Sequence, residues 1–150
     1  MTEDQKIYQK IGELLWSIMH DEAQKVTYSG FLYPDFKGYR SRWFTKDNDE
    51  KGFNIGFDNP IEGVEKELES LINDLQKCDL FAKEPWTHFE ASLNEECSFK
   101  IQFAYIPAED SWPSLHMRGI SDLTEEEAEH IYYVPKEIWE ERVRLKNDTN

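Results

Sequence analysis

Alternating apolar and polar residues between Trp86 and Tyr105 predict a β-hairpin. One series, Thr87 to Leu93, alternates with polar neighbours, and a second series, Cys97 to Tyr105, does so after a polar turn. A period of two places such a series on one face of a strand, whereas a helix would scatter it around its axis. Because a lone hairpin with one apolar face is unstable, other strands and amphipathic helices must cover that face.

Apolar residues at helical spacing predict four helices. The first and third follow a capping-box pair of Thr with Gln or Glu three residues later. The second begins with Asn before Pro, and proline has no amide hydrogen to lose at the first helical position. The predicted helices are Thr2 to about His20, Asn59 to about Lys77, Thr124 to about Ile131, and Pro135 onward.

Three further strands are predicted between the first two helices: Lys25–Tyr33, Gly38–Thr45 and Phe53–Phe57. Gly30 breaks the alternation of the first of these strands and indicates a bulge. The predicted order is therefore helix, three strands, helix, two strands and two helices. This order predicts one α+β domain over residues 1–150, with a meandering antiparallel sheet of about five strands covered by helices.

The length and composition set limits on function. No run of about eighteen apolar residues occurs in the 150 residues, so no membrane span is expected. The N-terminal residues are acidic and lack the apolar core region of a signal peptide. We therefore expect no signal peptide and a cytoplasmic location. Two cysteines, Cys78 and Cys97, fit buried reduced thiols better than a disulfide framework.

The formal net charge of −14 argues against a nucleic-acid partner and favours a basic protein partner. The charge is uneven, since residues 107–150 carry eleven acidic against five basic residues. The simpler interpretation is that acidic residues only keep the protein soluble. Aromatic residues near Arg40 and Arg42 would allow base stacking, yet the basic groove that nucleic acid needs is absent.

Catalytic and cofactor motifs are missing, so we expect no catalytic residue, no metal site and no cofactor. No glycine-rich phosphate loop occurs, and the four histidines stand far apart in the sequence. His88 and Glu90 lie two residues apart and would suit an acid and base pair. The alternative is that they belong to the polar outer face of the hairpin, opposite Phe89. An enzyme would also need a pocket that gathers His88, Glu90 or His116.

A proline-interrupted segment after Tyr105 is long for a compact domain and indicates a functional loop. It contains an aromatic residue next to acidic ones, a combination that suits a protein contact with long-range attraction to a basic partner. Each feature has an alternative: Trp112 either contacts a partner or folds back onto the core, and the later acidic run either contacts a partner or only favours a helix N-terminus. The predicted partner-binding residues are Glu109, Asp110, Trp112, His116, Glu125, Glu126, Glu127 and Glu129.

Three stretches of the chain resemble the YezG-like family of immunity (antitoxin) proteins, which includes the EsaG-type nuclease antitoxins. The stretches are IYQKIGELLWSI in the first helix, FNIGFDNPIEGVEKELESL, and the hairpin PWTHFEASLNEECSFKIQFAY. The resemblance covers about two thirds of the chain. The usual glycine of the hairpin turn is replaced here by residues 94–97, and residues 107–150 match only loosely.

The resemblance implies an α+β immunity protein that binds the C-terminal toxin domain of a secreted polymorphic toxin, commonly a nuclease, and neutralises it inside the producing cell. An acidic inhibitor would cover the positive surface with which a nuclease holds phosphates. Two other classes stay open: an acidic adaptor or regulatory module without a toxin partner, and an enzyme. The oligomeric state is not indicated by the sequence.

Overall fold

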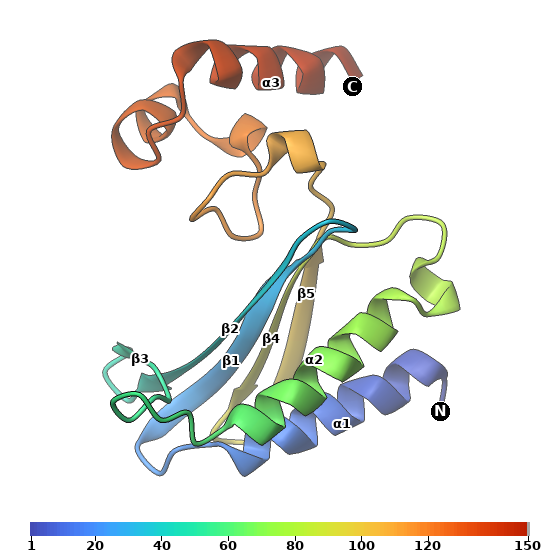
Figure 1. Ribbon diagram of the computed structural model, residues 1–150, viewed down its shortest axis with the longest axis vertical. Coiled ribbons are helices and arrows are strands. Elements are labelled where there is room, and N and C mark those ends of the chain that lie inside the picture. The colour runs from blue at the N-terminus through green and yellow to red at the C-terminus, as the bar shows by residue number, and fades with distance from the viewer. Residues whose placement is uncertain (150) are drawn as a thin grey trace. The chain divides into compact units, whose positions relative to one another are not determined.

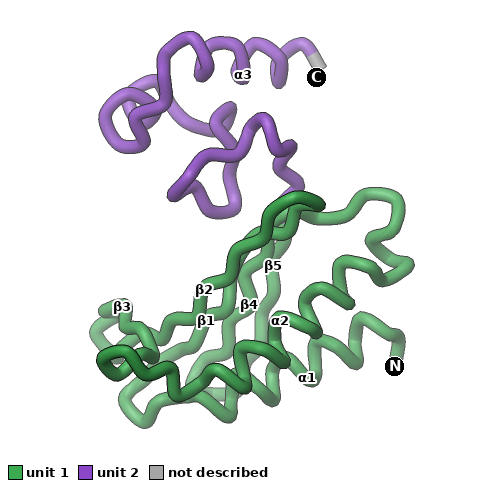
Figure 2. Tube along the Cα trace, in the orientation of Figure 1, with its two compact units in different colours: residues 1–103 green, residues 104–150 purple. Residues whose placement is uncertain are grey.

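A computed structural model describes residues 1–149 of the chain. The chain divides into two compact units, residues 1–103 and residues 104–150 (Figure 2). The single domain expected from the sequence stays a prediction.

Unit 1 contains a five-stranded sheet in the order β3-β2-β1-β4-β5, with two helices side by side on one of its faces (Figure 1). The predicted α+β class, the antiparallel sheet and the covering helices are thus confirmed. The elements are α1 (Glu3–Ser17), β1 (Ala23–Leu32), β2 (Lys37–Thr45), β3 (Glu50–Lys51), α2 (Glu62–Gln76), β4 (His88–Asn94) and β5 (Phe99–Ala104).

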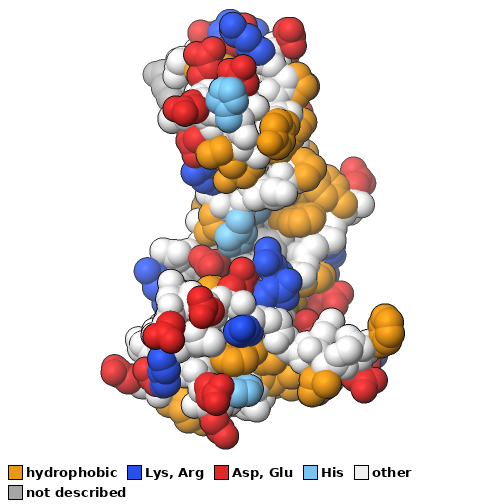
Figure 3. Space-filling model, turned by 90° about the vertical axis from the view of Figure 1, so that its left-hand side faces the viewer, with side chains coloured by type: hydrophobic (Ala, Val, Ile, Leu, Met, Phe, Trp, Pro, Cys, Tyr) orange, Lys and Arg blue, Asp and Glu red, His pale blue; other side chains and the backbone are white. Residues whose placement is uncertain are grey.

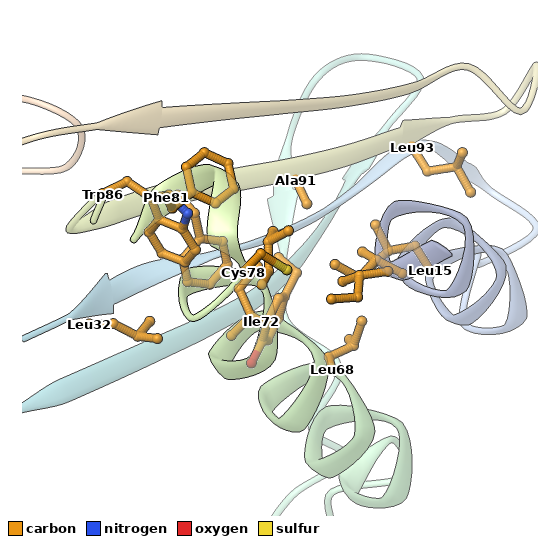
Figure 4. Close-up of a cluster of buried hydrophobic side chains, with 14 of the residues drawn as sticks. Leu15, Leu32, Leu68, Ile72, Cys78, Phe81, Trp86, Ala91 and Leu93 are labelled. Atoms are coloured by element: carbon orange, nitrogen blue, oxygen red, sulfur yellow. The ribbon is translucent and has the colours of Figure 1, made fainter. Parts of the chain in front are cut away.

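The pairing of the central strand β1 with its two neighbours places apolar side chains on one face of the sheet, and the core lies on that face. Val26 pairs with Trp43 of β2 and with Leu93 of β4, and residues directly opposite one another share a face. Val26 and Leu93 belong to the buried cluster, and Trp43 packs against it. Figure 4 shows that Leu15 of α1 and Leu68 of α2 point into the same cluster. Leu68 and Trp86 in this cluster are fully buried. Truncating a buried side chain of this size costs about 2–5 kcal/mol of folding free energy.

The helix starts follow their sequence signals with one shift. In α1, Gln5 accepts a hydrogen bond from the Thr2 backbone N–H at 3.0 Å, as the capping box predicts. The helix ends at Ser17, a little before the predicted end. In α2, the side chain of Asn59 accepts the Ile61 N–H at 3.2 Å, which holds a turn in front of the helix. The helix itself therefore begins at Glu62.

The strand predicted over Phe53–Phe57 is wrong. The chain reverses at Gly56, whose φ is +64°, and only a single bridge joins Ile55 to Asp58. Glycine takes this left-handed conformation without the strain that a Cβ causes. Ile55 and Phe57 are consequently exposed rather than half-buried. The third strand of the sheet is instead the short segment β3 in the preceding loop.

The bulge predicted at Gly30 is also wrong, because Gly30 pairs regularly with Tyr39 and Phe89. The irregular pairing occurs near the start of β1, between Ala23 and Lys25. Gly30 is needed for another reason. A Cβ at this position would lie 2.0 Å from the carbonyl oxygen of Gly38, which is much closer than atoms can approach.

Two predictions for the hairpin need correction. His88 lies on the face opposite Phe89, as predicted, but it is buried there: it is only 4% exposed and its ring packs near Phe31 and Tyr33. Cys97 is not a buried strand residue but lies exposed in the turn with φ +64°. The turn forms because the Asn94 side chain accepts the backbone N–H of Ser98 at 2.9 Å. Cys78 is buried, as predicted.

Unit 2 is built around a small apolar cluster. Two 3-10 turns, Ala108–Asp110 and Ile120–Asp122, a π-helical turn, Glu127–Ile131, and the helix α3 (Lys136–Thr149) surround it (Figure 1). The buried members of the cluster are Leu115, Ile120, Leu123, Ala128 and Val134. The helix predicted from Thr124 is thus a short turn that widens into π geometry.

Within the described part of the chain, no helix is both long enough and apolar enough to cross a membrane.

Candidate protein-binding surface

Asp110 lies inside unit 2 and holds its parts together. Only 5% of the residue is exposed. Its carboxylate accepts hydrogen bonds from the backbone N–H of Ser121 at 3.0 Å and from the Ser121 hydroxyl at 2.7 Å. The guanidinium of Arg142, on α3, donates to the same carboxylate at 3.2 Å. The charge of Asp110 is thus satisfied by buried contacts within unit 2, whereas its neighbour Glu109 is exposed.

Trp112 folds back onto the cluster of unit 2. Its indole N–H donates to the backbone carbonyl of Tyr132 at 2.9 Å, and its ring packs against the buried cluster. Of the two alternatives given by the sequence, the structure therefore has Trp112 on the core. His116 lies at the surface, next to Met117, whose φ is +64°.

Glu127 is half-buried and closes the start of the π-helical turn. Its carboxylate accepts the backbone N–H of Thr124 at 3.0 Å, and the Thr124 hydroxyl accepts the backbone N–H of Glu127 at 3.1 Å. Arg118 also donates to this carboxylate at 2.7 Å. This bond from Arg118 is the main reason that the pKa of Glu127 lies below its ordinary value. Glu127 thus has a structural role, as the capping box in the sequence indicates.

The remaining acidic residues project from the acidic turn, the name used here for residues 124–133. Glu125, Glu126 and Glu129 are all exposed. Glu129 has His130 beside it, with 3.7 Å between the His130 Nε2 and a carboxylate oxygen. On the face drawn in Figure 3, unit 2 shows several acidic side chains close together. Because Arg118 and Thr124 fix the start of this turn, the three carboxylates are presented by ordered backbone.

Two large apolar side chains are exposed on the same turn, and the sequence analysis did not identify them. Ile131 is 59% exposed and Tyr133 is 76% exposed. Tyr133 has φ +55°, a conformation that costs a non-glycine residue free energy and is concentrated at functional sites. The π-helical geometry of the turn is likewise frequent at such sites. The only sequence signal was the run IYYVP, which also fits a buried helix end.

A cavity of about 320 Å³ lies between the acidic turn and the start of α3. Ala128, Val134 and Trp139 form its apolar lining, and Glu125, Glu129 and Lys136 are its charged residues. Trp139 is fixed in place because its indole N–H donates to the carbonyl of Leu123 at 2.9 Å. Exposed carboxylates, exposed apolar side chains and this cavity thus occur together within about fifteen residues of chain.

Unit 1 has a second, more polar cavity of about 440 Å³ beside β2 and the start of α2. The hydroxyl of Ser41 donates to Glu65 at 2.8 Å, and the Asn59 amide donates to the same carboxylate at 2.6 Å. Arg40 and Arg42 line the cavity and pair with Glu50, at 3.1 Å and 3.7 Å. These polar groups therefore already have partners within unit 1.

The three residues that an enzyme was expected to gather belong to different units of the chain. His88 and Glu90 lie in unit 1, and His116 belongs to unit 2. His88 is buried, and its Nδ1 lies 2.9 Å from the Thr87 Oγ1, with which it forms a hydrogen bond. Over residues 1–149, no three His, Cys, Asp or Glu side chains lie together as metal ligands would.

Comparison with known proteins adds no relative. A scan against protein-family models finds no match to the chain, and a search of curated proteins finds none either. The resemblance to the YezG-like immunity proteins stays a prediction.

Proposed function

We propose that this protein is an immunity protein that binds and neutralises a basic toxin domain, and that the acidic turn of unit 2 is its binding surface. The observation that carries the proposal is the joint exposure of Glu125, Glu126 and Glu129 with Ile131 and Tyr133 on one ordered turn. The resemblance of three stretches of the chain to the YezG-like immunity proteins favours the same function.

The carboxylates of the turn would act first, at long range. A negative surface attracts a basic partner and raises the association rate, and the attraction weakens as salt screens it over about 8–10 Å. A toxin that cleaves nucleic acid needs positive surface to hold phosphates. Its positive surface therefore matches the charge of the turn, and covering it would block access of nucleic acid.

The two apolar side chains would act next, at contact. Burying exposed isoleucine and tyrosine against a partner stabilises the complex, by about 25 cal/mol for each Å² of apolar surface removed from water. Aromatic anchors surrounded by polar groups are the usual hot spots of protein interfaces. The ring of Tyr133 is already exposed on this turn, where a partner can reach it.

The test uses the protein encoded immediately upstream of this one in the genome as the candidate partner. A triple variant, E125K/E126K/E129K, reverses the charges of the turn and leaves the capping residue Glu127 in place. We expect association with the upstream protein to slow by at least about tenfold at low salt, with a smaller difference at moderate salt.

The matched control is E67K/E84K/E96K, which changes the net charge equally at exposed positions of unit 1. If only the net charge matters, both triple variants will slow association to the same extent, and the acidic turn is then not the binding surface. An upstream protein that binds but does not harm cells when expressed alone would overturn the immunity function and favour the adaptor class.

A further inference from the structure

The cavity beside the acidic turn has the composition of a socket for a long cationic side chain. Its lining is apolar where Ala128, Val134 and Trp139 contribute, and its charged groups include the carboxylates of Glu125 and Glu129. Its volume of about 320 Å³ is at the small end of the range for ligand pockets. An aliphatic stem would contact the apolar lining while a cation at its end meets the carboxylates.

A cation of the chain itself, Lys136, lines this cavity, and its ammonium is held loosely. The Lys136 ammonium is 3.9 Å from Glu125 and also 3.9 Å from Glu140, longer than the roughly 2.7–2.9 Å of a charge-assisted hydrogen bond. All three side chains are more than half exposed. Ion pairs of this kind contribute little, so another cation can replace Lys136 at small cost.

We infer that this cavity binds an arginine side chain of the partner protein, an inference that rests on the proposed function. Arginine fits better than lysine for two reasons. Its planar guanidinium stacks on an aromatic face such as that of Trp139, and it donates two parallel hydrogen bonds to a carboxylate. It is also less strongly hydrated than an ammonium group, so it enters a partly apolar cavity more readily.

The position of Lys136 gives the inference a consequence that a simple acidic surface does not have. Lys136 competes with the incoming guanidinium for Glu125. Removing its charge with K136M keeps the length of the side chain and frees the carboxylate. The affinity for arginine should therefore rise, by about twofold to fivefold, even though the net charge of the whole protein changes by only one unit.

The experiment titrates the full chain with three blocked amino acids: N-acetyl-arginine amide, N-acetyl-lysine amide and N-acetyl-norleucine amide. The readout is the NMR signal of the Trp139 indole N–H. The Trp112 indole serves as internal control, because Trp112 is held in unit 2 but does not line the cavity. We expect the arginine probe to shift the Trp139 signal with saturation, the lysine probe to bind more weakly, and norleucine to have no saturable effect.

Variants then connect this binding to the named residues. E125Q/E129Q should weaken arginine binding by about tenfold or more, and E137Q, an exposed neighbour on α3 outside the lining, should leave it unchanged. Equal binding of arginine and lysine would overturn the choice of arginine. Absence of saturable arginine binding, or unchanged affinity in E125Q/E129Q, would overturn the socket itself.

These outcomes are separate from the proposed function, because the probes need no partner protein. If the arginine probe does not bind but E125K/E126K/E129K no longer binds the upstream protein, the cavity is not an arginine site and the proposed binding surface stands. If arginine binds to the cavity but the triple variant keeps the upstream protein, the surface proposed for that protein is wrong.

Discussion

Replacing Asp110 by alanine should destabilise unit 2 strongly, although the same residue looks like a surface acid in the sequence. The change removes the acceptor for the Ser121 N–H, the Ser121 hydroxyl and the Arg142 guanidinium. The Arg142 side chain is only 20% exposed, so its charge would remain partly buried without a partner.

The magnitude follows from these contacts. Hydrogen bonds to charged groups contribute about 1.5–3 kcal/mol each but are not additive, and breaking a buried ion pair costs about 3–5 kcal/mol. Because Arg142 can reach water partly, we expect the lower end, about 3 kcal/mol. D110N retains one oxygen acceptor and should cost less, about 1–2 kcal/mol.

Amide hydrogen exchange measured by mass spectrometry separates the two units. About 3 kcal/mol corresponds to roughly a hundredfold faster exchange in protected amides of residues 104–149, where exchange follows unfolding of the unit. The matched control is E109A, the exposed neighbour, which should change stability by no more than about 0.5 kcal/mol. If D110A and E109A exchange alike, the buried ion pair has no structural role and the reasoning fails.

Three further predictions address the glycines, the cysteines and the response to acid. G30A should prevent correct pairing of β1 with β2 and lower the urea midpoint. G63A, in an open helical position, should raise the free energy of unfolding by up to about 1 kcal/mol and so raise the urea midpoint. Similar midpoints for the two variants would contradict this. Cys97 should react at once with a thiol reagent and Cys78 only on unfolding, since burial raises the Cys78 pKa; two fast thiols would refute it. The pKa of Glu127 is lowered in the folded protein, so its ionised carboxylate stabilises the fold above the ordinary pKa of 4.5, and this stabilisation is lost as pH falls through the folded pKa. E127Q should therefore make the urea midpoint depend less on pH in acid. An unchanged pH dependence of the midpoint would count against this.

The elements with strong periodicity were predictable because their signals are local. The alternation in β4 and β5 and the helical stripes of α1 and α2 each follow from which face meets the core. The segment Phe53–Phe57 shows where this fails. It alternates like a strand, yet a left-handed turn at Gly56 reverses the chain, and the alternation alone does not distinguish the two arrangements.

The candidate surface was predictable only in part. The acids Glu125, Glu126 and Glu129 were identified from charge, and they do lie exposed on one turn. Ile131 and Tyr133 were missed because apolar residues near a predicted helix end are normally expected to pack inward. Their exposure results from the π-helical turn and the positive φ at Tyr133, neither of which has a clear sequence signature.

What the sequence by itself determined is the α+β class, the hairpin, the capped helices and the excess of negative charge, because spacing and composition act over a few residues. Only the tertiary structure decided which acids are available to a partner. Glu109 and Asp110 are adjacent and chemically alike, yet one is exposed and the other is buried against Arg142, thirty-two positions away. A contact at that separation depends on how the whole unit packs, and the order of neighbouring residues does not specify it.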